Sequence, residues 1–313
     1  MCAIFGVLDY QGKLAPAQRL RMVKELGTAA EVRGTDATGI DYFQRDRLCI
    51  QKAPKAAHKM RYRLPAEVRY IMGHTRMTTQ GSPKQNQNNH PFPGKAGSQS
   101  FALAHNGVLY NDKDLRRTYK LPQTAIATDS YIAVQLIEAQ KEVSPDSLRR
   151  MAEVLRGSYT FTVLDQDNSL YFVKGENPLT IYHYPVLGLY LYASTEGILF
   201  EATNALGMGQ LEPEVIEPWD GEILKIDRHG HQSSSQFTMR DSAWGSWPFR
   251  SAWTAPRPRK QPVSPCYHTQ REYVQSLKSV AWCYGYEPEY VEQLIADGYT
   301  AEDVEELFYS RGC

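Results

Sequence analysis

The second residue of the chain is a cysteine, and this position could make it a nucleophile. Removal of Met1 would give Cys2 a thiol and a free α-amine in one residue. An α-amine has an ordinary pKa of about 7.7–8.0, so a fraction is neutral at cellular pH and can take the thiol proton. A nucleophile with an adjacent base suits covalent catalysis at a carbonyl carbon. The alternative interpretation is a small buried residue in a strand.

Two charged side chains could hold a small zwitterion beside such a thiol. Arg76 ends the run Gly73-His74-Thr75-Arg76 and could pair with a carboxylate through two parallel hydrogen bonds. Asp129 follows Thr128 and could receive an ammonium group. Each residue also has a structural interpretation, which is a salt bridge for Arg76 and a helix cap for Asp129.

The dipeptide Asn106-Gly107 offers two hydrogen-bond donors for a developing negative charge. A side-chain amide beside a glycine, whose backbone N–H can be approached closely, is one way to build an oxyanion hole. The same dipeptide is also a frequent hairpin turn. At this point both interpretations remain open.

The pattern around these residues predicts the elements that must position them. Apolar runs over 3–10 and 101–105 predict buried strands, and residues 20–26 have the spacing of a helix that ends near Gly27. Two further helices are expected at 130–140 and from Pro145 onward. Alternating residues then predict strands at 158–165, 170–174, 187–194 and 221–228. Helices followed by a run of strands favour an α+β fold with antiparallel sheets.

Composition limits the classes of function. The chain has 313 residues, with 35 basic and 35 acidic side chains, so it has no global electrostatic reason to bind nucleic acid or an anionic membrane. No run approaches the ~18 apolar residues of a membrane span, and the apolar start is too short for a signal peptide. The five scattered cysteines lack a C-x-x-C pair. We therefore expect a cytoplasmic protein with reduced thiols, no metal and no cofactor.

The C-terminal part of the chain changes character. Residues 231–266 are rich in Ser, Trp, Arg and Pro, which is typical of an extended linker. Residues 267–313 predict a small helical module, with Pro288 in the first turn of one helix and a capping box formed by Thr300 and Asp303. A module of this size is marginal alone, so we expect it to dock on the main domain or on a partner.

Several weak motifs occur together in a characteristic order. Cys2 precedes an apolar strand, and the chain then contains R-G-x-D-A-x-G from Arg33, G-H-T-R-x-x-T from Gly73, H-N-G from His105 and T-D-S from Thr128. In this order they resemble the class II glutamine amidotransferase domain, an N-terminal-nucleophile hydrolase. The match looks closest to the amidotransferase domains of glucosamine-phosphate synthase and amidophosphoribosyltransferase. It covers residues 1–230 and implies a four-layer αββα sandwich of two antiparallel sheets.

The resemblance implies an activity and the residues that carry it. L-Glutamine would be hydrolysed to glutamate and ammonia through a thioester on an N-terminal cysteine. Cys2 would be the nucleophile and its freed amine the base, and Asn106 and Gly107 would form the oxyanion hole. Two alternatives stay open, namely a module that binds glutamine or a partner without turnover, and a hydrolase of another γ-glutamyl amide.

The resemblance also implies how the substrate is held. Arg76 would bind the α-carboxylate of glutamine and Asp129 its α-ammonium. Thr79 would line the pocket, and Arg33 would order the site near the nucleophile. Gln80 stands where the synthase pattern has histidine, which puts coupling to an acceptor in question. Residues 240–313 are too few to form an acceptor domain, so we expect them to contact an acceptor enzyme or another partner.

Overall fold

The computed structural model describes residues 2–239, 274, 278, 288–297, 299 and 304. The chain divides into two compact units, residues 1–246 and residues 247–313. In the part of the chain that is described, no helix is both long enough and apolar enough to cross a membrane.

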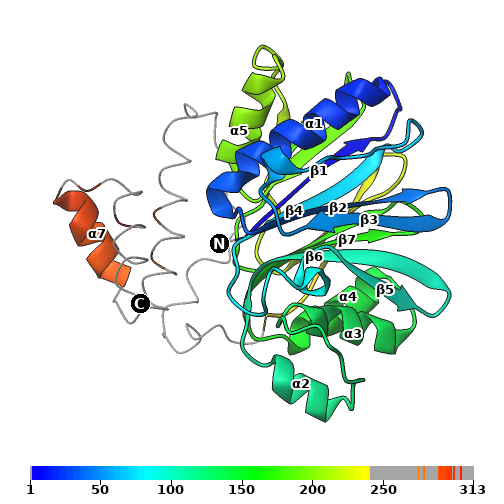
Figure 1. The fold of residues 1–313 in the computed structure, drawn as a ribbon, viewed down its shortest axis with the longest axis vertical. Coiled ribbons are helices and arrows are strands. Elements are labelled where there is room, and N and C mark those ends of the chain that lie inside the picture. Colours follow the sequence, from blue (N-terminus) through cyan, green and yellow to red (C-terminus); the bar gives the residue numbers. More distant parts are fainter. Residues whose placement is uncertain are drawn as a thin grey trace. The chain divides into compact units, whose positions relative to one another are not determined.

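The first unit contains a seven-stranded sheet in which all neighbouring strands are antiparallel (Figure 1). The strand order is β11-β9-β10-β1-β4-β2-β3. The strands span β1 (Ala3–Asp9), β2 (Ala37–Gln44), β3 (Arg47–Ala53), β4 (Tyr70–Arg76), β9 (Thr180–Tyr184), β10 (Leu189–Ala193) and β11 (Glu214–Ile216). The central pair β1 and β4 brings residue 3 opposite residue 75, so the start of β1 lies beside the end of β4.

A second sheet of six antiparallel strands faces the first, in the order β13-β12-β8-β7-β6-β5. Its strands span β5 (Phe92–Ala96), β6 (Gln99–Leu109), β7 (Gly157–Asp165), β8 (Leu170–Lys174), β12 (Glu222–Ile226) and β13 (Gln232–Gln236). Buried residues of both sheets, among them Ile4, Met72 and Phe172, form the core between them. The first two sequence-predicted strands, at 3–10 and 101–105, therefore lie in opposite sheets.

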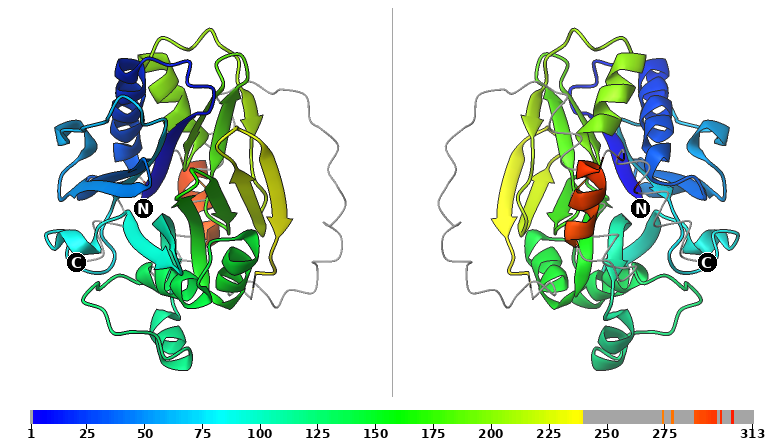
Figure 2. Two further views of the ribbon diagram at one scale, coloured as in Figure 1. Left: turned by 90° about the vertical axis from the view of Figure 1, so that its right-hand side faces the viewer. Right: turned by 90° about the vertical axis from the view of Figure 1, so that its left-hand side faces the viewer.

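Helices cover the outer face of each sheet (Figure 2). On the first sheet lie α1 (Pro16–Ala29) and α5 (Glu196–Ala205), and on the second lie α3 (Tyr131–Gln140) and α4 (Pro145–Val154). Shorter helices are α2 (Asp112–Thr118), η1 (Ala30–Arg33), η2 (Ala57–Lys59) and η3 (Asn86–Asn88). This arrangement confirms the expected α+β fold, a four-layer αββα sandwich of two antiparallel sheets.

Local sequence explains where two of the helices begin. Helix α4 starts at Pro145 after Ser144, whose hydroxyl accepts a hydrogen bond from the Ser147 N–H at 3.1 Å. A proline in the first turn gives up no helical hydrogen bond, and the serine side chain satisfies a free N–H. Helix α1 also starts with a proline, and it buries Val23 and Leu26 against the first sheet.

The dipeptide Asn106-Gly107 is not a hairpin turn. Strand β6 continues through it, and Asn106 lies opposite Thr160 of β7. Gly107 has a φ of +144°, and a Cβ there would lie 2.0 Å from the Ser158 carbonyl oxygen. The glycine is therefore required for the close approach of β7 rather than for a turn.

Strand β13 lies beyond residue 230, inside the segment 231–266 that its composition indicated to be a linker. Its five residues are Gln232-Ser-Ser-Ser-Gln236, and most of them are exposed because the strand is at the edge of its sheet. An edge strand exposed on both faces has no alternation of apolar and polar residues, which is the pattern from which strands are predicted.

In the second unit, helix α7 (Pro288–Ala296) begins at the proline that the sequence placed in a first turn. Val291 and Leu294, three residues apart, are its buried side chains. Lys278 forms an ion pair with Glu292 of this helix. The capping box expected at Thr300 and Asp303 lies outside the described residues.

Candidate active site

Cys2 lies immediately before β1, in the middle of the first sheet. Its thiol donates to the Met77 carbonyl oxygen, with the sulfur 3.4 Å from that atom. Burial raises the pKa of the Cys2 thiol, while the positive charges of the chain N-terminus, Arg76 and Arg33 act in the opposite direction. A base is therefore needed to produce the thiolate at neutral pH.

Arg33 is joined directly to the cysteine. Its Nε donates to the carbonyl oxygen of Cys2 at 2.9 Å, and its side chain is buried. Gly34 follows at the end of η1, and a Cβ on it would lie 2.4 Å from the carbonyl carbon of Arg76. Only glycine lets the backbone after Arg33 lie this close to the end of β4. The pair Arg33-Gly34 thus brings the start of β1 and the end of β4 together.

Arg76 is the last residue of β4, and its guanidinium is held by the segment that follows. Nη1 donates to Asn89 Oδ1 at 2.6 Å. Nη2 donates to the Gly81 carbonyl at 2.9 Å and also to the Gln80 carbonyl. These three contacts fix the guanidinium plane and leave two of its five N–H donors for another acceptor.

Asp129 is buried and precedes α3, whose N-cap is Ser130. Its Oδ2 accepts a hydrogen bond from the Leu109 N–H at 2.6 Å, so it ties the end of β6 to the start of α3. Burial raises the pKa of Asp129, and backbone hydrogen bonds, including the one from Leu109, partly offset this. Its negative charge in turn acts on the pKa of Arg76, so the two predicted zwitterion-binding groups share one electrostatic environment.

Asn106 lies on the face of β6 that meets the first sheet, in register with the core residue Ala104. The side chain is 1 % exposed, and its Nδ2 has no hydrogen-bond partner among the described residues. A buried donor without a partner costs about 1–3 kcal/mol, so a group that accepts a hydrogen bond from Asn106 Nδ2 would remove this cost. The His105 carbonyl, one residue earlier, is bonded to His74 Nε2 at 2.9 Å, which places this end of β6 against the end of β4.

Three buried histidines pack behind these residues. Burial lowers the pKa of both His74 and His105 to about 3, and that of His90 well below its ordinary value, so all three are neutral near pH 7. The rings of His74 and His90 are 4.2 Å apart, and His105 Nδ1 is 2.7 Å from Ser130 Oγ. Neutral imidazoles here connect strands. Within the described ranges, no group of three or more His, Cys, Asp or Glu side chains is arranged to hold a metal ion.

The remaining predicted residue, Thr79, lies on an exposed bend three residues after Arg76. Two side chains that sequence reasoning missed contact the predicted ones. Asn89 accepts from Arg76, as described above, and Asn177 Nδ2 donates to the Asn106 carbonyl at 2.8 Å. Asn177 stands before a proline between two strands, which indicates a connection but no chemistry. Neither asparagine has a local sequence signal for its contact.

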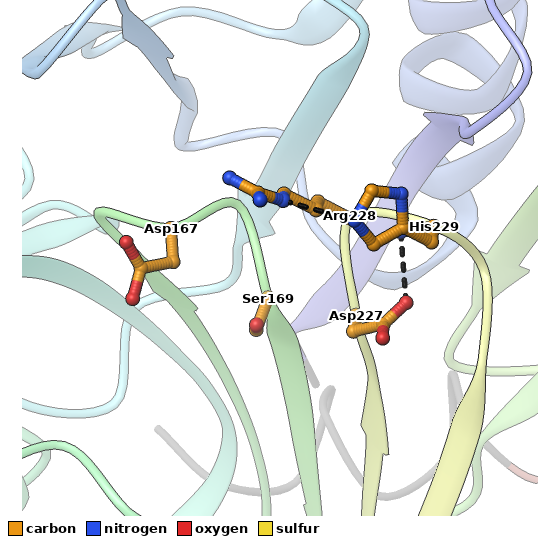
Figure 3. Close-up of a pocket in the computed structure, with 5 residues that line it drawn as sticks. All are labelled: Asp167, Ser169, Asp227, Arg228 and His229. Carbon is orange, nitrogen blue, oxygen red and sulfur yellow. Dashed lines mark hydrogen bonds between the residues drawn. The ribbon is translucent and has the colours of Figure 1, made fainter.

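A surface pocket lies on the second sheet (Figure 3). It is formed by the turns between β7 and β8 and between β12 and β13, and is lined by Asp167, Ser169, Asp227, Arg228 and His229. The His229 N–H donates to Asp227 Oδ1 at 2.8 Å. Because the β7–β8 turn follows the end of β7, whereas Asn106 pairs near its start, this pocket is separate from the predicted site.

Comparison with known proteins shows what this part of the chain is similar to. Residues 74–201 match the model of the glutamine amidotransferase domain. The chain is 29 % identical over 235 residues to the isomerizing glutamine–fructose-6-phosphate aminotransferase of Geobacillus kaustophilus, covering 72 % of this chain and 36 % of the relative. It is 30 % identical over 241 residues to the enzyme of the same name from Staphylococcus aureus strain Mu50, covering 73 % of this chain and 36 % of the relative. The chain thus spans about a third of the length of these relatives.

Two solved structures share the fold. One is the glutamine phosphoribosylpyrophosphate amidotransferase of B. subtilis complexed with ADP and GMP, with a TM-score of 0.58 and 20 % identity over 76 % of this chain and 50 % of the other. The second, an allosteric regulatory enzyme of purine biosynthesis, has a TM-score of 0.58 and 22 % identity over 76 % of this chain and 50 % of the other. At these identities the likeness extends to the fold of the two-sheet sandwich.

Proposed function

We propose that this chain, whose residues 74–201 match the glutamine amidotransferase domain, hydrolyses the side-chain amide of L-glutamine to glutamate and ammonia. The observation that carries the proposal is the buried Asn106 Nδ2, a donor without a partner on the face of β6 that meets the sheet of Cys2. A developing oxyanion would satisfy it. Five of the residues proposed for the site lie within the matched range 74–201, namely Arg76, Thr79, Asn106, Gly107 and Asp129.

Substrate binding in this proposal depends on opposite charges. Arg76 receives the α-carboxylate of glutamine and Asp129 the α-ammonium, each through charge-assisted hydrogen bonds worth roughly 1.5–3 kcal/mol. Thr79 lines the pocket on the segment after Arg76, and Arg33 orders the site through its bond to Cys2. With both α-groups fixed, the side-chain length of the substrate decides whether its amide reaches the sulfur. Asparagine is one methylene shorter and should be a poor substrate.

The reaction begins at Cys2 after removal of Met1. The α-amine takes the thiol proton, and Sγ forms a bond to the amide carbon of glutamine. The resulting oxyanion accepts hydrogen bonds from Asn106 Nδ2 and the Gly107 N–H. The Cys2 ammonium then returns its proton to the amide nitrogen, and the C–N bond breaks. Ammonia departs, and a γ-glutamyl thioester remains on Cys2. Water adds to the thioester with the amine as base, the C–S bond breaks, and glutamate is released with the thiol restored.

We further propose that ammonia is used by an acceptor enzyme, which would be reached through residues 240–313. The relatives are about three times longer than their matched part, and their names describe transfer to a second substrate. A cytoplasmic location fits the same proposal, because Cys2 must remain a reduced thiol to act. Cys2 and Cys49 are both free among the described residues.

The proposal is tested by measuring ammonia released from L-glutamine by the full chain and by Cys2→Ala. We expect glutamine-dependent release from the unchanged protein and none from the variant. Cys49→Ala is the matched control, since Cys49 lies on the edge strand β3 and should leave the rate unchanged. Release that persists in Cys2→Ala would remove the mechanism. Comparing glutamine with other γ-glutamyl amides identifies the preferred substrate.

A further inference from the structure

Asn177 lies across the peptide bond that joins Asn106 to Gly107. It belongs to the connection between β8 and β9, and its Nδ2 donates to the Asn106 carbonyl oxygen at 2.8 Å. A Cβ built on Gly107 would fall 2.6 Å from that same Nδ2. The side-chain amide of Asn177 is therefore packed against both halves of one peptide unit.

This contact determines where the Gly107 N–H points. A trans peptide is planar, and its C=O and N–H point in opposite directions. Because Asn177 holds the carbonyl of this unit, the Gly107 N–H is directed away from Asn177. Along a strand, successive carbonyls also alternate in direction. The His105 carbonyl points to His74 at the end of β4, so the Gly107 N–H lies on the same side as that contact and faces the site.

Asn177 is itself anchored to the strand beside Asn106. Its backbone carbonyl accepts a hydrogen bond from Thr160 Oγ1 at 2.7 Å, and Thr160 is fully buried. Thr160 is the residue opposite Asn106 in the β6–β7 ladder. Each of Asn106, Thr160 and Asn177 therefore contacts the other two. Pro178 follows and restricts the backbone of the connection.

Gly107 cannot orient this peptide by its own packing. It has no side chain, and its φ of +144° belongs to a region that glycine enters without cost. The peptide before this glycine is therefore held by its neighbours, first by the ladder between β6 and β7. Asn177 adds a side-chain contact to its carbonyl oxygen, from 71 positions away in the sequence.

We propose that Asn177 is the positioning residue of the oxyanion hole, holding the Asn106–Gly107 peptide so that the Gly107 N–H faces the reacting carbonyl. This inference rests on the proposed hydrolysis of glutamine. Asn177 acts through that peptide and makes no contact with the reacting atoms in this assignment. Oxyanion donors act on the transition state more than on bound substrate, so loss of their alignment lowers kcat and leaves KM nearly unchanged.

The test compares two variants of Asn177 with a matched control in the full chain. Asn177→Asp removes the donor at nearly constant volume, and Asn177→Ala removes the whole contact, so a folding failure of one still leaves the other. The control is Asn111→Ala. Asn111 also bridges backbone groups, donating to the Val154 carbonyl at 2.9 Å and accepting from the Arg156 N–H at 3.0 Å, without contacting Asn106.

Steady-state kinetics with L-glutamine provide the first readout. Removing an oxyanion donor outright costs on the order of 10²–10³ in kcat, so misalignment of one should lower kcat by about 10- to 100-fold. We expect this loss in both Asn177 variants with KM changed less than about twofold, and a kcat near the unchanged value in Asn111→Ala. An unchanged kcat, a rise in KM alone, or an equal loss in the control overturns the inference.

A crystal structure of Asn177→Asp separates this inference from the proposed function. We expect the Asn106–Gly107 peptide to turn away from its present orientation, because a carboxylate repels the carbonyl oxygen. If the unchanged chain releases no ammonia, the proposed function fails, and the peptide orientation alone decides the positioning role. A peptide that keeps its orientation in the variant overturns that role in either case.

Discussion

The carboxylate of Asp129 accepts a hydrogen bond from the Leu109 N–H at 2.6 Å, which fixes the start of α3 to the end of β6. Leu109 comes two residues after Gly107, so the group proposed to bind the substrate ammonium also supports the strand that carries the oxyanion donors. In the proposed mechanism, one buried side chain therefore links substrate binding to transition-state stabilisation.

Asp129→Asn should weaken glutamine binding more than it weakens the fold. An amide oxygen can still accept from Leu109, whereas the charge that pairs with the ammonium is lost. We expect KM for glutamine to rise at least about tenfold, as a charge-assisted bond worth roughly 1.5–3 kcal/mol is removed. Steady-state kinetics check this, with the unfolding midpoint measured in parallel. A KM within twofold of the unchanged value would contradict the binding role.

The same carboxylate should set the acidic limit of activity. Burial raises the pKa of Asp129, so it becomes protonated at a higher pH than an ordinary aspartate would. As pH falls through this raised pKa, kcat/KM for glutamine should fall because the ammonium loses its partner. A pH profile of kcat/KM checks this, and the fall at acidic pH should be absent from Asp129→Asn. The same acidic fall in both proteins would assign it to another group.

Arg76 should depend on Asn89 for its alignment. Asn89→Leu removes the oxygen that accepts from Arg76 Nη1. We expect KM for glutamine to rise about tenfold to 150-fold, or roughly 1.5–3 kcal/mol, the scale of a hydrogen bond to a charged group. Asn89→Asp is the matched control, because it keeps an acceptor oxygen at the same place. Equal KM values in the two variants would show that this contact does not align the guanidinium.

Gly34→Ala should destabilise the protein by steric conflict. The φ of Gly34 is 169°, which alanine adopts without strain, but its Cβ would lie 2.4 Å from the carbonyl carbon of Arg76. We expect a loss of about 2–4 kcal/mol in the free energy of unfolding. Gly207→Ala is the comparison, since Gly207 has a φ of +76° and nothing within 4 Å, so it should cost only about 1 kcal/mol. Denaturant unfolding measures both, and equal losses would contradict the steric account.

Asp41 should reduce stability at neutral pH. It is fully buried, neither carboxylate oxygen has a partner among the described residues, and burial raises its pKa well above 3.8. Below pH 3.8 both folded and unfolded states hold the proton. As pH rises toward the folded-state pKa, only the unfolded state releases it, so stability falls.

Asp41→Asn has no carboxylate to ionise, so its stability does not fall in this way as pH rises. It should be more stable than the unchanged chain at pH 7 by about 1–3 kcal/mol. The difference should vanish at acidic pH. Denaturant unfolding across pH measures it, and a variant that is less stable at pH 7 would contradict this explanation.

The sequence predicted the elements whose signals are local, and it missed others, among them β2, β3, β9 and α5. Ser144 and Pro145 mark the start of α4, and alternating apolar residues mark β7 and β8. The motifs around Arg76, Asn106 and Asp129 were found because each is a short run. Their mutual arrangement was implied by a family resemblance, not by any local pattern.

What sequence reasoning missed depends on distant contacts. Asn177 contacts a residue 71 positions away, and the need for glycine at Gly34 comes from the backbone of Arg76. Asn106-Gly107 has the composition of a turn, but pairing with β7 keeps it in a strand. Local propensity carries no information about such partners.

The central claim is that Cys2 becomes the first residue and carries the substrate acyl group. Mass spectrometry of the N-terminal peptide, after acid quenching of the full chain during turnover with L-glutamine, tests this directly. We predict a peptide that begins at Cys2 and carries a γ-glutamyl group on its sulfur. A preparation that releases ammonia while Met1 is retained, or with the glutamyl group on another residue, would contradict the account.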